Sequence, residues 1–233
     1  MKFSKRKKTI LEKIDVMKTY ALQDAISLLK GFPKLKFSET VDISINLGID
    51  TKKSDQNVRG SSTLPHGIGK PSIVVVFAEG EGAAAAKKAG ADKVGFEDLI
   101  EEIKKNKDLE ADIVIASPEC MKLLGQLGRI LGPKNLMPNP KEGTVTKNIS
   151  QAVKKAKKGQ IRYKIDKAGI IHTTVGKLDF EEKQLRENIK TLIDDLNKVK
   201  PSSTKGKYMK NLTLSSTMGP GIRVDLSTIA EGR

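Results

Sequence analysis

The chain has 233 residues, enough for one large or two ordinary domains, and its 37% apolar share suffices for hydrophobic cores. Its 43 Lys and Arg against 28 Asp and Glu give a net charge of +15, which points to a polyanion such as nucleic acid, the alternative being a basic surface that only aids solubility. The single cysteine, Cys120, excludes an internal disulfide and suits a reducing cytoplasm, and two distant histidines do not suggest a zinc site.

The first expected elements are helices followed by a strand. Residues 9–31 have apolar side chains at helical spacing, with a break near Thr19 and an end at Gly31. Residues 41–47 alternate apolar and polar side chains, which is typical of a strand with one buried face. The polar stretch 51–70 is rich in Gly, Ser and Pro, and we expect it to be a loop.

The next part of the chain alternates continuously apolar strands with helices. Strands are expected within 71–80 and 111–117, and helices over 83–91, 94–106 and 117–131. Strands of this kind are buried on both faces, which indicates a parallel α/β unit. The most apolar run, Ile73 to Ala78, is far too short to cross a bilayer, so we expect a soluble protein without membrane contact.

After Gly159 the alternating pattern returns. Two strands flank the turn at 166–169 and are expected to form a hairpin. Residues 179–199 have the spacing of an amphipathic helix, and further strands are expected over 207–215 and 222–226.

The order of these elements predicts a discontinuous domain. A strand at 41–47 needs partners, and the strands available to it lie after residue 160. We therefore expect an α+β domain from residues 1–67 with 160–233, and an inserted α/β domain over 68–159, joined by a hinge. The terminal segments carry a net charge of +11 and the inserted segment +4, counted from the sequence. The terminal domain is thus expected to attract the polyanion.

Two glycine-containing stretches resemble phosphate-binding motifs only in part. The stretch HGIGKPS at 66–72 has Pro71 where a Walker-type loop needs a hydroxyl, and a strand follows it. Gly80 and Gly82 have the spacing of a dinucleotide fold, but no ribose-binding acid follows on a strand of its own. We therefore expect no cofactor, and an interdomain linker and a tight strand-to-helix turn explain these residues better.

The stretch 127–145 is a long loop with two prolines that follows a helix. It carries Arg129, Lys134 and Lys141. These side chains suit a second surface for phosphates, and the alternative is a long ordered connection without a binding role.

Two further stretches are candidates for RNA contact. Lys36, Phe37 and Thr40 stand just before the strand at 41–47, and an aromatic beside lysines is suited to stacking on a nucleotide. Alternatively, Phe37 only fixes its loop to the core. The stretch SSTMGPGIRV at 215–224 combines hydroxyls, glycines and an adaptable methionine after a strand, and we interpret it as a shape-selective RNA contact.

The runs SDQNVRG, LPHGIGK, LGRILGP with LMPNPK and GTV, and STMGPG resemble the L-one family of large-subunit ribosomal proteins in its bacterial form. The likeness extends over essentially the whole chain. It implies a split β-α-β domain built from both chain ends and an inserted Rossmann-like three-layer α/β domain without a cofactor. It also implies binding to the large ribosomal RNA at the mobile stalk beside the tRNA exit site, help in releasing deacylated tRNA, and repression of the protein's own operon through its mRNA.

The resemblance also implies which residues contact RNA. The corresponding positions here are Lys36, Phe37, Thr40, Thr217, Met218, Gly219 and Asn211, the last where many relatives have Ser. Asn135 stands where Gly is common in the family. Arg129, Lys134 and Lys141 are candidates for secondary contacts with RNA or tRNA.

The protein so implied is a structural component of the ribosome in the cytoplasm, not an enzyme, and monomeric when free. Its expected partners are large-subunit ribosomal RNA, its own mRNA and exit-site tRNA. Two alternatives remain, a nucleotide-dependent enzyme that uses Gly80 and Gly82, and a nonspecific basic binder.

Overall fold

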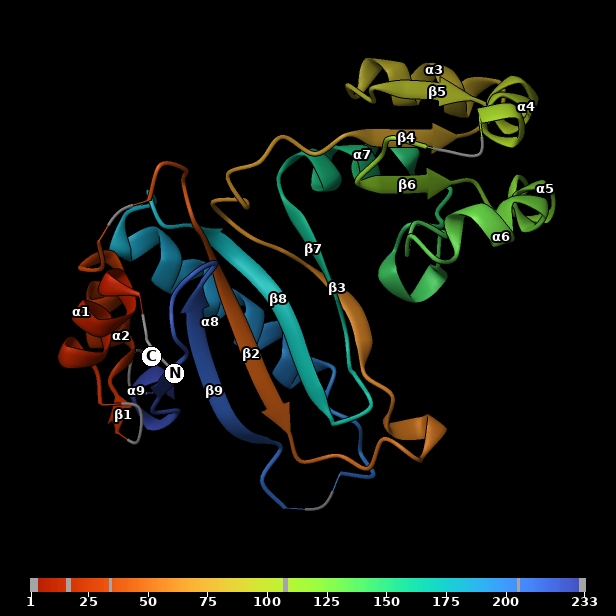
Figure 1. Ribbon diagram of the computed structural model, residues 1–233. Helices are drawn as coiled ribbons and strands as arrows, with labels where there is room; N and C mark the ends of the chain where they lie inside the picture. Colours follow the sequence, from red (N-terminus) through yellow and green to blue (C-terminus); the bar gives the residue numbers. More distant parts are fainter. Residues whose placement is uncertain (1–3, 16–17, 34, 107–108, 205, 231–233) are drawn as a thin grey trace. The chain divides into compact units, whose positions relative to one another are not determined.

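The computed structural model describes residues 4–15, 18–33, 35–106, 109–204 and 206–230. It is a mixed α/β structure with several sheets (Figure 1). The chain divides into two compact units. Unit 1 comprises Met1–Gly69 and Ile161–Arg233, and unit 2 comprises Lys70–Gln160. Within the described ranges, no helix is long and apolar enough to cross a membrane.

Unit 1 is built around a five-stranded sheet with the order β1-β10-β9-β2-β8. Its strands are β1 (Thr19–Tyr20), β2 (Thr40–Leu47), β8 (Ile170–Lys177), β9 (Met209–Ser216) and β10 (Ile222–Val224). A separate two-stranded sheet joins β3 (Arg59–Thr63) and β7 (Gln160–Lys164). The helices are α1 (Lys5–Lys13), α2 (Leu22–Lys30), the 3-10 turn η1 (Ser54–Gln56), α8 (Glu182–Lys198) and α9 (Ser227–Ala230).

The core of unit 1 lies on one face of the five-stranded sheet. Val41, Ile43, Ile45 and Leu47 of β2 are buried, and the residues between them are half exposed. The buried side chains join α2 and α8 in one hydrophobic cluster, and Figure 1 shows α8 running along this face. The other face of the sheet is polar, as expected for an antiparallel sheet with one covered side.

Three expectations for unit 1 are confirmed. The helical pattern at 9–31 is two helices, and β1 occupies the break near Thr19. The strand at 41–47 finds both neighbours after residue 160, since Ile43 stands opposite Thr173 of β8 and Leu214 of β9. The amphipathic helix expected at 179–199 is α8.

The expected loop at 51–70 is wrong in part, because it contains β3. This strand has the sequence RGSST, so it lacks the large apolar residues by which a buried face is recognised. Its buried positions are Gly60 and Ser62. A Cβ at Gly60 would lie 2.8 Å from the hydroxyl of Tyr163 on β7, so the glycine makes room for the neighbouring strand.

The hairpin expected around 166–169 is also wrong in part. The turn forms, because the carboxylate of Asp166 accepts hydrogen bonds from the amides of Ala168 and Ile170. The two strands then separate into different sheets, and a bridge between Ile165 and Ile171 joins them at the turn. β7 pairs with β3 instead, and β8 pairs with β2.

Unit 2 is built around a three-stranded parallel sheet with the order β5-β4-β6. Its strands are β4 (Val74–Phe77), β5 (Lys93–Gly95) and β6 (Ile113–Ala116). Its longer helices are α3 (Glu81–Lys88), α4 (Glu97–Asn106) and α7 (Ile149–Lys157). Shorter turns follow β6, namely α5 (Met121–Leu124), η2 (Gly125–Leu127), α6 (Gly128–Leu131) and η3 (Pro140–Glu142). The single helix expected over 117–131 is thus interrupted, at glycines that weaken helices.

The sheet of unit 2 is covered on both faces. Val74 and Val76 of β4 join one hydrophobic cluster with α3 and α7, whereas Val75 and Phe77 join another with α4, α5 and α6. All four residues of β4 are buried. The continuously apolar strands are therefore explained by two separate cores, as the sequence predicted.

Candidate nucleic-acid interface

Thr40 and Thr217 meet where β2 begins and β9 ends. The Thr40 amide donates to the hydroxyl of Thr217 over 3.0 Å, and the Thr217 amide donates to the carbonyl of Thr40 over 3.1 Å. The two hydroxyl oxygens lie 2.9 Å apart. Because a hydroxyl has two lone pairs and one proton, this pair retains capacity for a further partner on its exposed side.

Two large apolar side chains stand in solvent on the segments that flank this pair. Phe37 is 52% exposed and Met218 is 64% exposed. Most side chains of this kind in the described part of the chain are covered, the others that are exposed being Ile73 and Val199. An exposed aromatic and an exposed thioether near polar and basic groups suit contact with ribose and base surfaces.

Gly219 makes a tight turn directly after these residues. Its amide donates to the carbonyl of Ser216 over 2.9 Å. A Cβ at this position would collide with the hydroxyl oxygen of Ser216, so a larger residue requires that side chain or the turn to shift. The glycine therefore allows the turn beside Met218 to pack closely against Ser216.

Lys36 and Phe37 border a hollow of about 470 Å³ at the same end of unit 1. The hollow is lined by Lys30, Leu35, Lys36, Phe37, Ser38, Glu39, Leu178 and Asp179. The hydroxyl of Ser38 donates to the carboxylate of Asp179 there. Lys36 is exposed and supplies positive charge beside the aromatic ring.

Asn211 lies apart from these residues, toward the other end of β9. It stands opposite Asn46 of β2, and six residues of extended chain place it about 20 Å from Thr217. The structure therefore does not bring it together with Thr40 and Thr217, although it is exposed on the same strand.

The polar face of the sheet connects the two ends. The hydroxyl of Ser44 lies 3.1 Å from Nδ1 of His172, and the hydroxyl of Thr174 donates to Asp42 over 2.8 Å. Hydrogen bonds from the backbone amides, chiefly that of Ile170, hold the pKa of Asp166 below its usual value, and His172 adds to this effect. The face thus carries hydroxyl, carboxylate and imidazole groups on β2 and β8.

The candidate residues of unit 2 are all exposed. Arg129 lies in α6, Lys141 in η3 and Lys134 in the segment between them. Asn135 has a φ of 55°, the left-handed conformation that glycine adopts most easily. Asparagine also tolerates this conformation, so the turn is compatible with the residue present.

Gly82 has a packing role in unit 2 that does not involve a nucleotide. A Cβ on Gly82 would lie 2.9 Å from Cδ1 of Ile149, so the glycine allows α3 to approach α7. Gly80 has a φ of 57° and stands at the start of α3. Across the described ranges, no cluster of His, Cys, Asp and Glu is placed to hold a metal ion.

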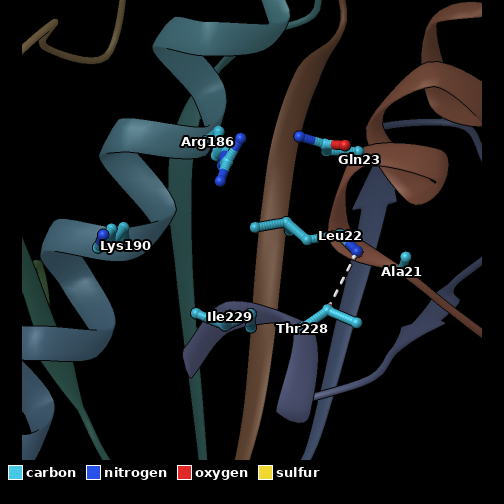
Figure 2. Close-up of a pocket in the computed structure, with 7 residues that line it drawn as sticks. All are labelled: Ala21, Leu22, Gln23, Arg186, Lys190, Thr228 and Ile229. Carbon is cyan, nitrogen blue, oxygen red and sulfur yellow. Dashed lines mark hydrogen bonds between the residues drawn. The ribbon is translucent and has the colours of Figure 1, made fainter. Parts of the chain in front are cut away.

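A further hollow, of about 240 Å³, lies between α2, α8 and α9 (Figure 2). Figure 2 shows Arg186 and Lys190 of α8 on one side and the start of α2 on the other. The amide of Leu22 donates to the hydroxyl of Thr228 over 3.4 Å. This contact provides an acceptor for an amide at the N-terminus of α2, where the N-cap residue Ala21 has no side-chain acceptor of its own.

Sequence reasoning missed Glu39, which lies under the candidate interface. Its side chain is 2% exposed, and its carboxylate accepts a hydrogen bond from the amide of Met218 over 3.0 Å. A buried acid next to Phe37 and Thr40 is visible in the sequence only as one more charged residue. Its contacts come from segments far away in the chain.

The profile of the family described as Ribosomal protein L1p/L10e matches residues 29–220. The chain belongs to this family. Curated relatives named large ribosomal subunit protein uL1 extend the match to nearly the full length. The protein of Vibrio vulnificus (strain YJ016) is 55% identical over 228 residues, covering 98% of this chain and 97% of its own length.

Two further relatives of the family carry the same name. The protein of Coxiella burnetii (strain RSA 331 / Henzerling II) is 55% identical over 228 residues, with 98% of each chain covered. That of Proteus mirabilis (strain HI4320) is 54% identical over 229 residues, with the same coverage. Because this family consists of ribosomal proteins, which are structural and not enzymatic, the nucleotide-dependent enzyme loses its support.

Proposed function

We propose that this protein is a structural constituent of the large ribosomal subunit that binds large-subunit ribosomal RNA through unit 1. The observation that carries the proposal is the joined end of β2 and β9, where the segments that hold the Thr40–Thr217 pair also carry exposed Phe37 and Met218. Membership in a family of ribosomal proteins gives the surface its partner class. The RNA is the mobile stalk near the tRNA exit site, and the protein acts in the cytoplasm on the ribosome.

The contact combines long-range attraction with a local fit. The Lys and Arg of the terminal segments attract the phosphates in a salt-dependent manner. Selectivity comes from an RNA shape that accepts the ring of Phe37, the side chain of Met218 and the hydroxyls of Thr40 and Thr217. The turn at Gly219 lets the RNA backbone approach closely, and Asn211 adds a hydrogen bond farther along the sheet.

The two compact units correspond, in this proposal, to the two domains of the family fold. Residues 1–67 with 160–233 form the split β-α-β RNA-binding domain, and residues 68–159 form the inserted Rossmann-like domain. Arg129, Lys134 and Lys141 of the inserted domain make secondary contacts with RNA or with exit-site tRNA. The protein is monomeric when free, aids release of deacylated tRNA, and represses its own operon by binding its mRNA.

A filter-binding titration at fixed salt tests the main proposal. Thr217→Val removes the hydroxyl from the joined strand ends, and Met218→Asp places a negative charge where RNA would lie. We expect each variant to bind stalk RNA about 10- to 100-fold more weakly than the unchanged protein. Unchanged affinity of both folded variants would contradict the proposal.

Two controls separate the alternatives. A nonspecific basic binder would bind stalk RNA and an unrelated RNA duplex of equal length alike, whereas we expect a clear preference for the stalk. Competition between the ribosomal RNA site and the messenger RNA site tests the repressor role. If the messenger RNA site competes for the protein no better than the unrelated duplex does, the repressor role is contradicted, and the proposed binding to ribosomal RNA is unaffected.

A further inference from the structure

We propose that Glu39 and Arg6 are positioning residues for RNA recognition, which hold Met218 in its RNA-contacting position before RNA arrives. The inference rests on the proposed function of unit 1. Neither residue touches RNA through its functional atoms in this scheme. Their charged groups are occupied within the protein.

Glu39 connects the start of β2 to the turn after β9. One carboxylate oxygen, Oε1, accepts from the amide of Met218 over 3.0 Å and from the hydroxyl of Ser216 over 3.4 Å. The other oxygen, Oε2, lies 2.9 Å from a guanidinium nitrogen of Arg6. The side chain is 2% exposed, so these groups replace the water that a carboxylate normally binds.

Arg6 connects α1 to the same turn from the other side. Its Nη1 donates to the carbonyl of Met218 over 3.1 Å, and its Nε donates to the carbonyl of Pro33 over 3.2 Å. Its Nη2 is paired with Glu39. The guanidinium therefore uses each of its nitrogens within the protein, and the side chain is 20% exposed.

Both backbone polar groups of Met218 are consequently occupied. Its amide is held by Glu39 and its carbonyl by Arg6, while its side chain is 64% exposed. A residue held at both ends of its peptide presents its side chain to solvent in a restricted set of positions. Such preorganisation lowers the cost of ordering the turn when RNA binds.

General stability is a weak explanation for this arrangement. A buried ion pair contributes little net stability, because desolvation of both charges offsets their attraction, and apolar residues of similar volume often serve as well. The charged groups of Arg6 and Glu39 hold three separate segments through directional hydrogen bonds. A requirement for one defined geometry of the turn explains them better than stability does. The segments are α1, the stretch before β2, and the turn after β9.

The rival explanation is that Arg6 binds an RNA phosphate directly. Salt dependence distinguishes the two. Loss of one direct phosphate contact makes the slope of log K against log salt shallower by about 0.7 to 0.9. Loss of a positioning residue lowers affinity at every salt concentration and leaves the slope unchanged.

The experiment measures stalk RNA affinity of the full chain at several salt concentrations for Glu39→Gln, Glu39→Ala, Arg6→Ala and Arg6→Lys. We expect Glu39→Ala and Arg6→Ala each to weaken binding about tenfold, with an unchanged slope. Arg6→Lys should not restore affinity, because one ammonium cannot reach three acceptors in a fixed fork. Arg186→Ala on α8 is the matched control, since it removes the same charge away from the turn, and it should retain stalk affinity.

A double-mutant cycle and hydrogen exchange complete the test. In the Thr217→Val background, Glu39→Gln should add little further loss, because both changes disturb the same turn. Amide exchange in the free protein should accelerate at Met218 in Glu39→Gln, an isosteric variant that retains the fold if Glu39→Ala does not. This measurement needs no RNA, so it tests whether Glu39 holds Met218 independently of RNA binding. If the unchanged protein shows no preference for stalk RNA, the proposed function is refuted, and the exchange result still tests the positioning role.

Three results would overturn the inference. These are a slope for Arg6→Ala that is shallower by one phosphate contact, full stalk affinity of folded Glu39→Gln and Glu39→Ala, and unchanged exchange at Met218.

Discussion

The two units use their sheets differently, and β2 and β4 show the difference most directly. In β2 only alternate residues are buried, so one face of its sheet is free and polar. In β4 every residue is buried, and helices cover both faces of its sheet. A sheet with a free face offers a surface and strand ends for contact with a partner. A sheet covered on both faces has no free face, and the candidate residues of unit 2 lie in turns and in the short helix α6.

The largest expected difference between the units is in RNA affinity. Thr217→Val combined with Met218→Asp in unit 1 should weaken stalk binding by more than about 100-fold. Replacing Arg129, Lys134 and Lys141 of unit 2 by Ala should weaken binding less, equally for stalk RNA and an unrelated duplex, and with a shallower salt slope. Titrations of both variants with both RNAs make the measurement. Equal, stalk-selective losses from the two units would contradict the expected difference between them.

The next test compares adjacent residues within each strand. Ile43→Thr should lower the free energy of unfolding by about 2–4 kcal/mol, because it shortens a buried side chain and buries a hydroxyl. Ser44→Thr, on the free face, should change it by less than about 0.5 kcal/mol. In β4, Val75→Thr and Val76→Thr should each cost about 1–3 kcal/mol. Urea unfolding measures all four, and a tolerated change at either β4 position would contradict the two-core description.

Alkaline pH should affect unit 1 selectively through Tyr208. Burial raises the pKa of this phenol from 10 to about 12, with a smaller contribution from Tyr163, and the side chain is 6% exposed. Because the folded pKa is the higher one, stability is intact below pH 10 and is lost as the pH rises toward 12. The loss approaches about 2–3 kcal/mol at the upper end.

Tyr208→Phe should remove this component of alkaline unfolding. At neutral pH it should change stability little, because the hydroxyl has no hydrogen-bond partner within the described residues. Thermal melts between pH 8 and 12 compare the two proteins. All three tyrosines of the chain belong to unit 1. Hydrogen exchange can follow the stability of each unit separately, and an equal loss of stability in unit 2 at alkaline pH would contradict the assignment to Tyr208.

The smallest expected effect concerns a turn of unit 2. Asn135→Gly should leave the free energy of unfolding within about 0.5 kcal/mol, because glycine adopts the left-handed conformation without strain. Asn135→Val should lower it by about 1–2 kcal/mol, since a β-branched residue is unfavourable at this φ. Calorimetric melting of both variants provides the comparison. A tolerated valine would mean that the turn changes its backbone conformation.

Local patterns predicted those elements whose apolar residues repeat clearly. The alternation at 41–47 predicted β2 and its exposed face, and the continuous runs around Val75 and Val114 predicted buried parallel strands. The strand β3 was missed because Gly60 and Ser62 fill its buried positions, and neither is a hydrophobic signal. The separation of β7 from β8 was missed because pairing depends on which other strand edges are available, and that is a property of the whole fold.

The sequence led to some of the residues of the candidate site and not to others. Phe37, Met218 and Gly219 were named from the family resemblance and from the local sequence, and their role in RNA binding stays a prediction. The role of Glu39 was not accessible, because its partners Arg6 and Met218 are distant in the chain and no local spacing connects them. Contacts of this kind follow from the assembly of the sheet, in which β2 and β9 are neighbours although they are distant in the chain.

Thr40 and Thr217, whose hydrogen bonds join the strand ends, are 177 positions apart. As the chain is synthesised from its N-terminus, unit 2 emerges as one continuous stretch and can fold as soon as it is complete. β2 emerges early but lacks both neighbours until β8 and β9 have followed it. A chain that terminates before β9 therefore has no Thr217 and no turn at Met218, however well its middle has folded. The joined strand ends, on which the proposed RNA contact depends, therefore form only when nearly the whole chain has been made.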